Sequence, residues 1–581
     1  MSAIQCMLSI TFWGLPVIPC SLLVIITATI VITLLCKYPA WGSKEKDSND
    51  RPNKPRHEKW FYAWIIGIAM LGGAWAFFLP IAINSGFGKD DDGAALRQAL
   101  IYTTGGILGV ITLGETHRKN TLEKTKNDQD HTRQVHAERR SRYTTAVEQL
   151  SSDKASIRLG GVYTLVGLVD EWLSDEKTTS SPEERHKEGQ VIINNLCAYI
   201  RSPLPLAERA EQLDKDYAKD LQNDFDGDIE KFDADKRAFA RDKAALEEER
   251  QVRQSIIEEI HKRLQYIGTP GSWSKLDYDF SNAHFFYPIV FTNSCFDASS
   301  RFFGASFTQD TDFSGTTFTE RAPFSEATFT CTPFSGTTFT ERAPFSGAIF
   351  TEGVGFFRVT FTQDADFSET TFTEGAPFSG ATFLQDANFS RAAFTRDAHF
   401  FGAKFTGYAD FFEAEFTGNA GFSEAEFTGN ADFSMAKFTG NANFSKAKFT
   451  EASFSGAGFT KNANFFGAEF TRYANFFRAK FTRYANFFRA EFTEADFSGA
   501  KFTEASFSEA IFEHIPIFRG TEGSNLSIPA KFSCKANSKD YQFKVSPDSP
   551  CMIETEEQEH NGAKFTIPKG AELFDPDEPS E

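Results

Sequence analysis

A phenylalanine that recurs every five or six residues dominates the carboxyl-terminal half of this chain. From Phe400 to Phe444 nine phenylalanines follow one another at alternating steps of five and six, and an alanine precedes each by two positions. A helix needs apolar residues every three to four positions and a half-buried strand every two. Neither accounts for this spacing. The interval instead predicts a solenoid of short straight sides joined by regular corners.

The offset between alanine and phenylalanine predicts the geometry of this solenoid. Residues two apart in extended backbone point the same way, so each alanine and phenylalanine should face inward and the polar residues between them outward. Four sides close one coil in about 22 residues, so residues 276–518 allow roughly 11 coils about 4.8 Å apart, in a rod about 50 Å long. Phe411 should therefore stack on Phe433, and Phe422 on Phe444.

Five-residue units such as Ala495–Gly499 (A-D-F-S-G) and Ala500–Glu504 (A-K-F-T-E) resemble those of the pentapeptide-repeat family. The unit of that family centres on Leu or Phe, with a small residue two positions earlier. The resemblance covers roughly two fifths of the chain and implies a right-handed, quadrilateral β-helix. Steps such as Phe427–Phe433 depart from the family pattern by one extra residue between Thr and Ala. We interpret this residue as a corner bulge, often Gly or Asn because these tolerate unusual dihedral angles.

Three apolar stretches, at about residues 10–36, 60–83 and 95–114, predict a membrane anchor over residues 1–114. The third is short, and it crosses a bilayer only if it begins near Ala94 and buries Arg97; a buried helix is the alternative. Basic residues gather between the first two stretches and again after the third, which places both regions on the cytoplasmic side. We therefore expect a multi-pass protein of the cell membrane whose carboxyl-terminal repeat domain is cytoplasmic.

Residues 115–204 are predicted to form a helical module. Its segment from Arg142 to Leu165 looks like the cytoplasmic module that often precedes the repeats in membrane-anchored actinobacterial pentapeptide-repeat proteins. A binding site around Asp153, Arg158 and a glycine pair is one interpretation. We favour a turn between helices, capped within Ser151–Asp153, with an internal Asp153–Arg158 pair and close packing at the glycines. The residues that carry the resemblance are Ala146, Glu148, Gln149, Leu150, Ser152, Asp153, Arg158, Leu159, Gly160, Gly161 and Tyr163.

Residues 205–266 contain a charged insertion and a final helix. Apolar residues recur every three to four positions from Leu213 to Phe232. This predicts long helices with a narrow apolar stripe, in either a coiled-coil arm or a hairpin on the module. Both self-association and a solvated helix fit this stripe. In residues 519–581 the repeat fails, and we expect a segment that caps the open solenoid end, followed by a disordered acidic tail from Phe574.

The chain offers no recognisable catalytic, cofactor or metal constellation. Histidines and cysteines are scattered, and neither a phosphate-binding loop nor a nucleophile elbow occurs. We therefore expect no enzyme, no cofactor and no metal. The remaining candidate is the rod surface, where Arg472, Arg478, Lys480, Arg483 and Arg489 form a basic band near the far end. Arg472 and Arg483, however, lie half a coil apart and should face opposite ways. The candidate interaction residues are Arg472, Tyr473, Arg478, Arg483, Tyr484 and Arg489; ordinary solvated side chains are the alternative.

Two functions fit these features. The first is a non-enzymatic scaffold, integral to the membrane, that presents a rigid rod to an unknown protein partner in the cytoplasm. The second is a DNA mimic that inhibits a type II topoisomerase, as the resemblance implies for some acidic members of the family. The net charge of −19 argues against direct binding to nucleic acid and is compatible with mimicry. Charge that alternates in sign along the rod disfavours a mimic, which needs a continuous negative stripe.

Overall fold

The structure is a computed structural model of the whole chain. It describes residues 56–82, 92–265, 272–522 and 526–577, together with a few residues between 11 and 33 that include β1 (Thr11–Phe12) and β2 (Leu15–Pro16). The predicted stretch 10–36 lies almost wholly outside the described residues. The chain divides into two compact units, Met1–Val135 and His136–Glu581.

The first unit contains α3 (Arg56–Ala82) and the beginning of α4 (Asp92–Leu150). Among the described residues, one helix is long and apolar enough to cross a membrane, the part of α4 that begins at Ala94; none of its apolar window is buried. Helix α3 contributes the shorter apolar run Trp64–Pro80. The two helices approach closely at Gly72, where a Cβ atom would lie 2.0 Å from Cγ2 of Thr104. Small residues at such contacts are typical of apolar helices that pack together.

The second unit begins with a helical module that includes the end of α4. A break at residues 151–154 precedes α5, whose N-cap is Lys154 without a side-chain cap, so the predicted cap within Ser151–Asp153 is wrong. The predicted Asp153–Arg158 pair is also wrong, because Arg158 binds the Ser152 carbonyl at 2.9 Å and Glu249 at 3.4 Å. Close packing at Gly161 is confirmed, since a Cβ there would lie 2.7 Å from the carbonyl oxygen of Ala146. The helical elements are α5 (Ala155–Ser174), α6 (Pro182–Arg201), η1 (Pro205–Arg209), α7 (Ala210–Asp214), η2 (Lys219–Phe225) and α8 (Ile229–Leu264).

The charged insertion folds back on itself as a hairpin. Helix α8 runs unbroken through the second half of the insertion and the predicted final helix. The Tyr217 ring lies 5.6 Å from that of Phe232 and 5.2 Å from that of Phe239, and its hydroxyl donates to Asp235 at 2.6 Å. The apolar stripe is therefore used mainly inside the hairpin, although Ile229 is exposed.

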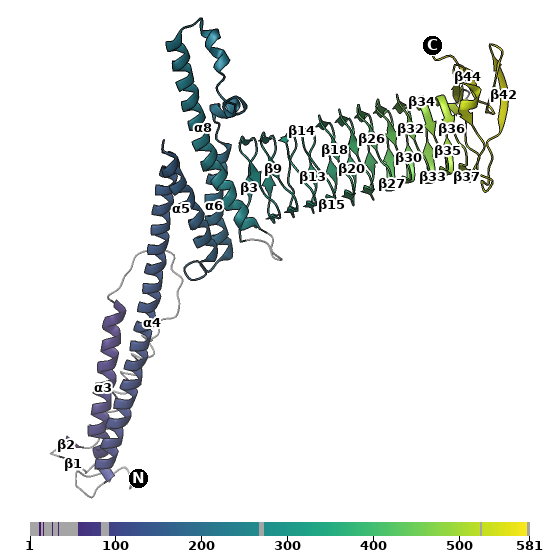
Figure 1. Cartoon of the computed structure of the whole chain (residues 1–581). Coiled ribbons are helices and arrows are strands. Elements are labelled where there is room, and N and C mark those ends of the chain that lie inside the picture. Colours follow the sequence, from purple (N-terminus) through teal and green to yellow (C-terminus); the bar gives the residue numbers. More distant parts are fainter. Residues whose placement is uncertain are drawn as a thin grey trace, which may run out of the picture. The chain divides into compact units, whose positions relative to one another are not determined.

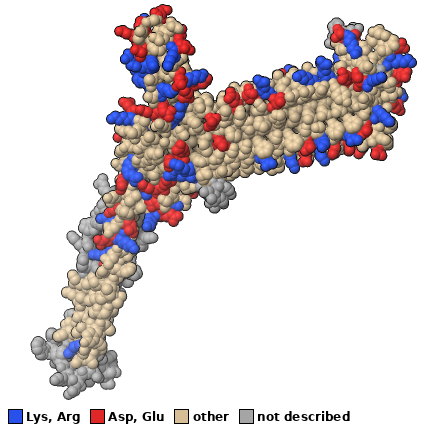
Figure 2. Space-filling model, viewed as in Figure 1, with Lys and Arg blue, Asp and Glu red and all other residues tan. Residues whose placement is uncertain are grey.

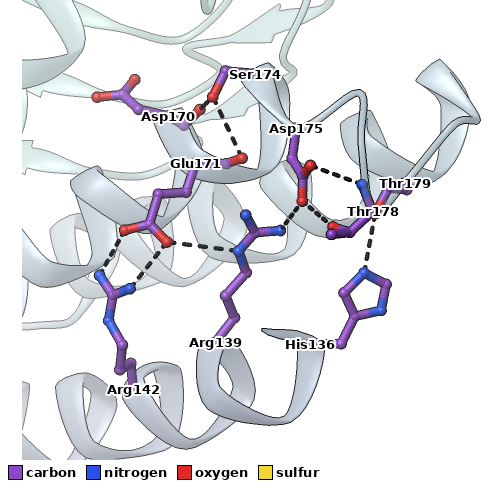
Figure 3. A network of polar contacts seen from close by, with 9 residues as sticks. All are labelled: His136, Arg139, Arg142, Asp170, Glu171, Ser174, Asp175, Thr178 and Thr179. Carbon is purple, nitrogen blue, oxygen red and sulfur yellow. Dashed lines mark hydrogen bonds and ion pairs between the residues drawn. The ribbon is translucent and has the colours of Figure 1, made fainter. Parts of the chain in front are cut away.

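A partly buried polar network joins the end of α5 to α4 (Figure 3). Arg139 pairs with Asp175 at 2.8 Å, and its guanidinium lies 4.6 Å from the centre of the Trp172 ring. Burial alone would raise the pKa of Asp175, but hydrogen bonds from Thr178 and the pair with Arg139 hold that pKa well below its usual range. Further contacts of the network join Arg142 to Glu171 and His136 to Thr179.

The solenoid forms the rod of stacked coils in Figure 1, from β3 (Tyr278–Asp279) to β37 (Ile511–Phe512). Its short strands pair in parallel with strands one coil further along, so that Phe383 lies opposite Phe405. The rings of Phe411 and Phe433 stack with centroids 4.7 Å apart, and those of Phe422 and Phe444 with centroids 5.0 Å apart. These pairs and the roughly 22-residue coil confirm the predicted solenoid of about 11 turns.

We name the four sides by their buried phenylalanine columns. Side one contains Phe378, Phe400, Phe422 and Phe444; side two Phe383, Phe405, Phe427 and Phe449; side three Phe389, Phe411, Phe433 and Phe454; side four Phe394, Phe416, Phe438 and Phe459.

The corners differ from their predicted dihedral angles. The extra residue does produce irregular register, as between Phe427 and Asn430. Left-handed backbone occurs at the longer corner between Phe350 and Phe356, at Gly353 with φ 54°, but elsewhere it falls at the shorter corners, for example at Glu413 with φ 56°. Glycine at the longer corners supplies space, because a Cβ on Gly429 would lie 2.0 Å from the carbonyl oxygen of Gly407. The longer-corner glycines without left-handed φ are Gly375, Gly407, Gly418, Gly429 and Gly440.

Helix α8 and the residues after it join the module to the first coils. Trp273 is fully buried and donates its indole N–H to Asp170 at 2.8 Å, and Arg263 pairs with the same carboxylate at 2.7 Å. On α8, the buried Arg253 donates to the Ile200 carbonyl at the end of α6, at 2.7 Å. One continuous core of buried side chains consequently runs from the module through the solenoid.

At the other end, the solenoid extends beyond its predicted limit at residue 518. Phe532 stacks on Phe502 at 5.1 Å and Phe543 on Phe507 at 5.9 Å, so two columns continue there. In the acidic tail, Asp575 pairs with Lys535 at 2.9 Å, and residues 578–581 lie outside the described part of the chain. The capping elements are the hairpins β38 (Arg519–Glu522) with β39 (Leu526–Pro529) and β42 (Thr555–His560) with β43 (Ala563–Pro568), the turn η3 (Ser538–Asp540), and the strands β40 (Lys531–Ser533), β41 (Tyr541–Gln542) and β44 (Glu572–Phe574).

Candidate interaction surface

Charged side chains of the solenoid gather along its edges, with a broad uncharged face between them in Figure 2. The predicted interaction residues are divided between different sides of the rod. Arg472 and Tyr473 lie on β33 (Glu469–Asn475), whereas Arg483 and Tyr484 lie on β34 (Lys480–Asn486), and the two strands belong to different sheets. The six residues therefore do not form one patch.

Several of these predicted residues already have partners within the chain. Arg472 pairs with Glu451 at 3.0 Å, and Arg489 pairs with Glu509 at 2.6 Å. The Tyr473 hydroxyl donates to Asp496 at 3.3 Å, and burial, followed by the Asp496 charge, raises the pKa of Tyr473 to about 12. The Arg478 guanidinium lies 5.1 Å from the centre of the Phe477 ring.

A different set of cations does come together, on side four near its carboxyl-terminal end. Lys480, Lys501 and Lys531 occupy equivalent positions on β34, β36 (Lys501–Ser506) and β40, in direct register. Each lies between an inward alanine and an inward phenylalanine, so its side chain points outward. Adjacent strands lie about 4.8 Å apart. We call these three residues the lysine ladder.

Elsewhere on the rod, lysines in this outward position are neutralised by a neighbouring coil. Lys437 on side four pairs with Glu415 at 2.7 Å, and on side two Lys448 pairs with Glu469 at 3.3 Å. Within the described part of the chain, by contrast, no ion pair joins a ladder lysine to a carboxylate. The lysine ladder therefore stacks three lysines in register, whereas Lys404, Lys437 and Lys448 each pair with a glutamate.

Further positive charge surrounds each residue of the lysine ladder. Burial and the charges of Lys531 and Lys480 lower the pKa of Lys501. Arg483 is exposed three residues beyond Lys480 on the same strand. Like charges directly opposite each other destabilise a sheet. Glu572 on β44 lies opposite Lys531 in register, but its carboxylate pairs with Arg519 at 2.9 Å. Among the described residues, no ion pair therefore offsets the repulsion between Lys480 and Lys501.

Sequence reasoning included Lys480 in the basic band but missed Lys501 and Lys531. The signal was the triplet A-K-F at residues 479–481, 500–502 and 530–532, although the same triplet also occurs at 403–405, 436–438, 447–449 and 563–565. The hairpin β38–β39 separates the last two triplets, and this insertion hid their register. Among the residues that the structure describes, no group of three or more His, Cys, Asp or Glu side chains is arranged to hold a metal ion.

Residues 276–518 thus define a class of protein, the right-handed β-solenoid built from short repeats. Two family models, both described as pentapeptide repeats, match this region, one of nine copies at residues 302–360, 356–404 and 422–469 and one of eight copies at 474–515. The region from residue 302 to residue 515 is therefore a pentapeptide-repeat domain. Searches of curated proteins and of solved structures returned no match.

Proposed function

We propose that this protein is a non-enzymatic scaffold, in which the solenoid presents a rigid surface to a protein partner. The observation that supports this function is the filled interior of the rod. Its inward positions hold phenylalanine and small side chains that are almost completely buried, so a ligand has access to the outer surface of the coils. Repeat solenoids commonly use such extended surfaces for binding.

The proposed location is the cell membrane, crossed more than once, with the solenoid in the cytoplasm. The apolar part of α4 and the apolar run in α3 support an anchor, and the basic residues that flank the predicted spans support the orientation. Alkaline carbonate extraction tests the anchor. We expect the full chain in the membrane pellet; recovery in the supernatant would contradict integral insertion.

Proximity labelling in the native cell tests the scaffold role. Three chains are compared: the full chain, a chain that ends at Tyr266, and a chain that lacks residues 379–444. The last deletion joins equivalent positions of side one, because Phe378 and Phe444 belong to the same column, and it keeps both ends of the rod. We expect the full chain to label partners that the chain ending at Tyr266 does not label. An identical set of partners would assign binding to the helices.

The alternative function, a DNA mimic that inhibits a type II topoisomerase, has weaker support. Side three carries Asp366, Asp410 and Asp432, but Asn388 interrupts the row, and side four carries the lysine ladder. A DNA mimic requires closely spaced negative charges over a long surface. Inhibition of DNA supercoiling by micromolar full chain would favour the mimic over the scaffold.

A further inference from the structure

We propose that the lysine ladder, together with Arg483, docks an extended acidic segment of a partner protein. The inference deepens the proposed function, on which it rests in taking the partner to be a protein. It identifies the part of the rod that binds and the chemistry of the partner.

The first argument is the missing countercharge. Outside the ladder, lysines in this outward position pair with a glutamate of a neighbouring coil, as Lys404 does with Glu426 at 3.6 Å and Lys448 with Glu469 at 3.3 Å. In the lysine ladder, three lysines follow one another in register instead. A partner that supplies carboxylates would turn mutual repulsion into attraction, and complementary charge of this kind directs both association and register.

The second argument concerns the chemical class of the occupant. Where lysines of this rod are neutralised, a carboxylate on a neighbouring strand or the tail does so, as Glu415 does for Lys437 at 2.7 Å and Asp575 for Lys535 at 2.9 Å. The first residue of the acidic tail also reaches the ladder, because the Phe574 ring centre lies 5.7 Å from Lys501 Nζ, and Glu572 of the same strand lies opposite Lys531. This surface thus already accepts extended backbone that carries carboxylates.

The overall charge favours a short acidic segment over a large polyanion. A nucleic acid or an anionic membrane would face a large part of the protein surface, and the net charge of −19 would repel it. A short acidic peptide would face mainly the positive charge of the ladder, because salt screens charges further away. Lysine side chains have long flexible stems, so ammonium groups from strands about 4.8 Å apart can meet carboxylates that alternate along an extended peptide at about 6.6 Å.

Fluorescence anisotropy with a labelled poly-glutamate decapeptide and the full chain in detergent tests the proposal. The Lys480→Gln, Lys501→Gln double variant is compared with a control, Lys404→Gln, Lys448→Gln, which removes the same charge from side two. We expect binding to weaken about tenfold or more in the ladder variant and less than about twofold in the control. No binding to the unaltered chain, or equal loss in both variants, would overturn the proposal.

Two further measurements complete the test. Duplex DNA and vesicles that contain phosphatidylserine serve as competing probes, and tighter ladder-dependent binding of either would overturn the assignment to an acidic peptide. The ladder variant should melt no lower than the control, because it relieves repulsion; a lower melting temperature would remove the premise of missing countercharge. If the peptide does not bind while the labelled partners still depend on the rod, docking at the lysine ladder is refuted and the scaffold function is retained.

Discussion

Each inward phenylalanine is held by two kinds of ring contact. Phe400 stacks on Phe378 at 4.9 Å and on Phe422 at 4.7 Å within its column, and it meets Phe411 of side three edge-on at 5.6 Å. Stacked and edge-on pairs both add to the stability that comes from burial. Every ring is thus fixed along the rod and across it, which explains why one residue type can fill four columns.

Two neighbouring phenylalanines separate the effect of burial from that of residue type. Phe400 is fully buried, whereas 53% of Phe401 is exposed. We expect Phe400→Ala to lower the free energy of unfolding by about 3–5 kcal/mol because it leaves a cavity among stacked rings. Phe401→Ala should change it by less than about 0.5 kcal/mol. Urea unfolding followed by circular dichroism measures both, and equal effects would contradict the inward column.

A second prediction concerns the close approach of coils at the longer corners. Gly429→Ala places a Cβ against the Gly407 carbonyl, so the backbone must shift, and we expect a loss of about 1–3 kcal/mol. Gly458→Ala is the matched control, because a methyl group at that position would meet no atom within 4 Å outside its chain neighbours; it should be neutral or stabilising by up to about 1 kcal/mol. The same unfolding assay separates them, and a neutral Gly429→Ala would show that the corner has room.

At the level of elements, ion pairs from residues distant in sequence hold the helical module together. The Arg139–Asp175 pair links α4 to the turn after α5, and the Arg158–Glu249 pair links α5 to α8. The repeat period was sufficient to predict the solenoid core, because it repeats a local pattern of facing residues. The partner of Arg158 could not be predicted in the same way, since it depends on how α8 packs. The same holds for the lysine ladder, whose third member follows an inserted hairpin.

The low pKa of Asp175 predicts a pH dependence for this part of the module. A carboxyl whose pKa is lower in the folded chain stabilises it fully above its unfolded pKa of about 3.9, and this stabilisation is lost as pH falls toward the folded pKa. We expect Asp175→Asn to destabilise α5 by about 1–3 kcal/mol at pH 7. The difference from the unaltered chain should shrink below about pH 4. Hydrogen exchange of the α5 amides measures it, and a difference that grows on acidification would refute the assigned sign.

On the scale of the whole molecule, the rod is a one-dimensional stack between two different ends. The helical module covers one end through α8 and Trp273, and the hairpins after residue 518 lie at the other. Each coil between them contacts mainly its neighbours, so stability should be close to a sum over coils and their interfaces. Length can then change without loss of fold, provided that the four columns stay in register.

Deletion of one whole coil tests this independence. Removal of residues 401–422 joins Phe400 to Ser423, which reproduces the native step from Phe422 to Ser423, and places the remaining rings back in their columns. We expect the shortened chain to keep its circular dichroism spectrum and to melt within about 5 °C of the full chain, because it loses one repeat and its interface. Removal of residues 401–424 instead joins Phe400 to Ala425 and eliminates a corner, so every later ring leaves its column and we expect aggregation on size-exclusion chromatography. Equal behaviour of the two deletions would mean that the phenylalanine register does not determine the fold, since only the first deletion preserves it.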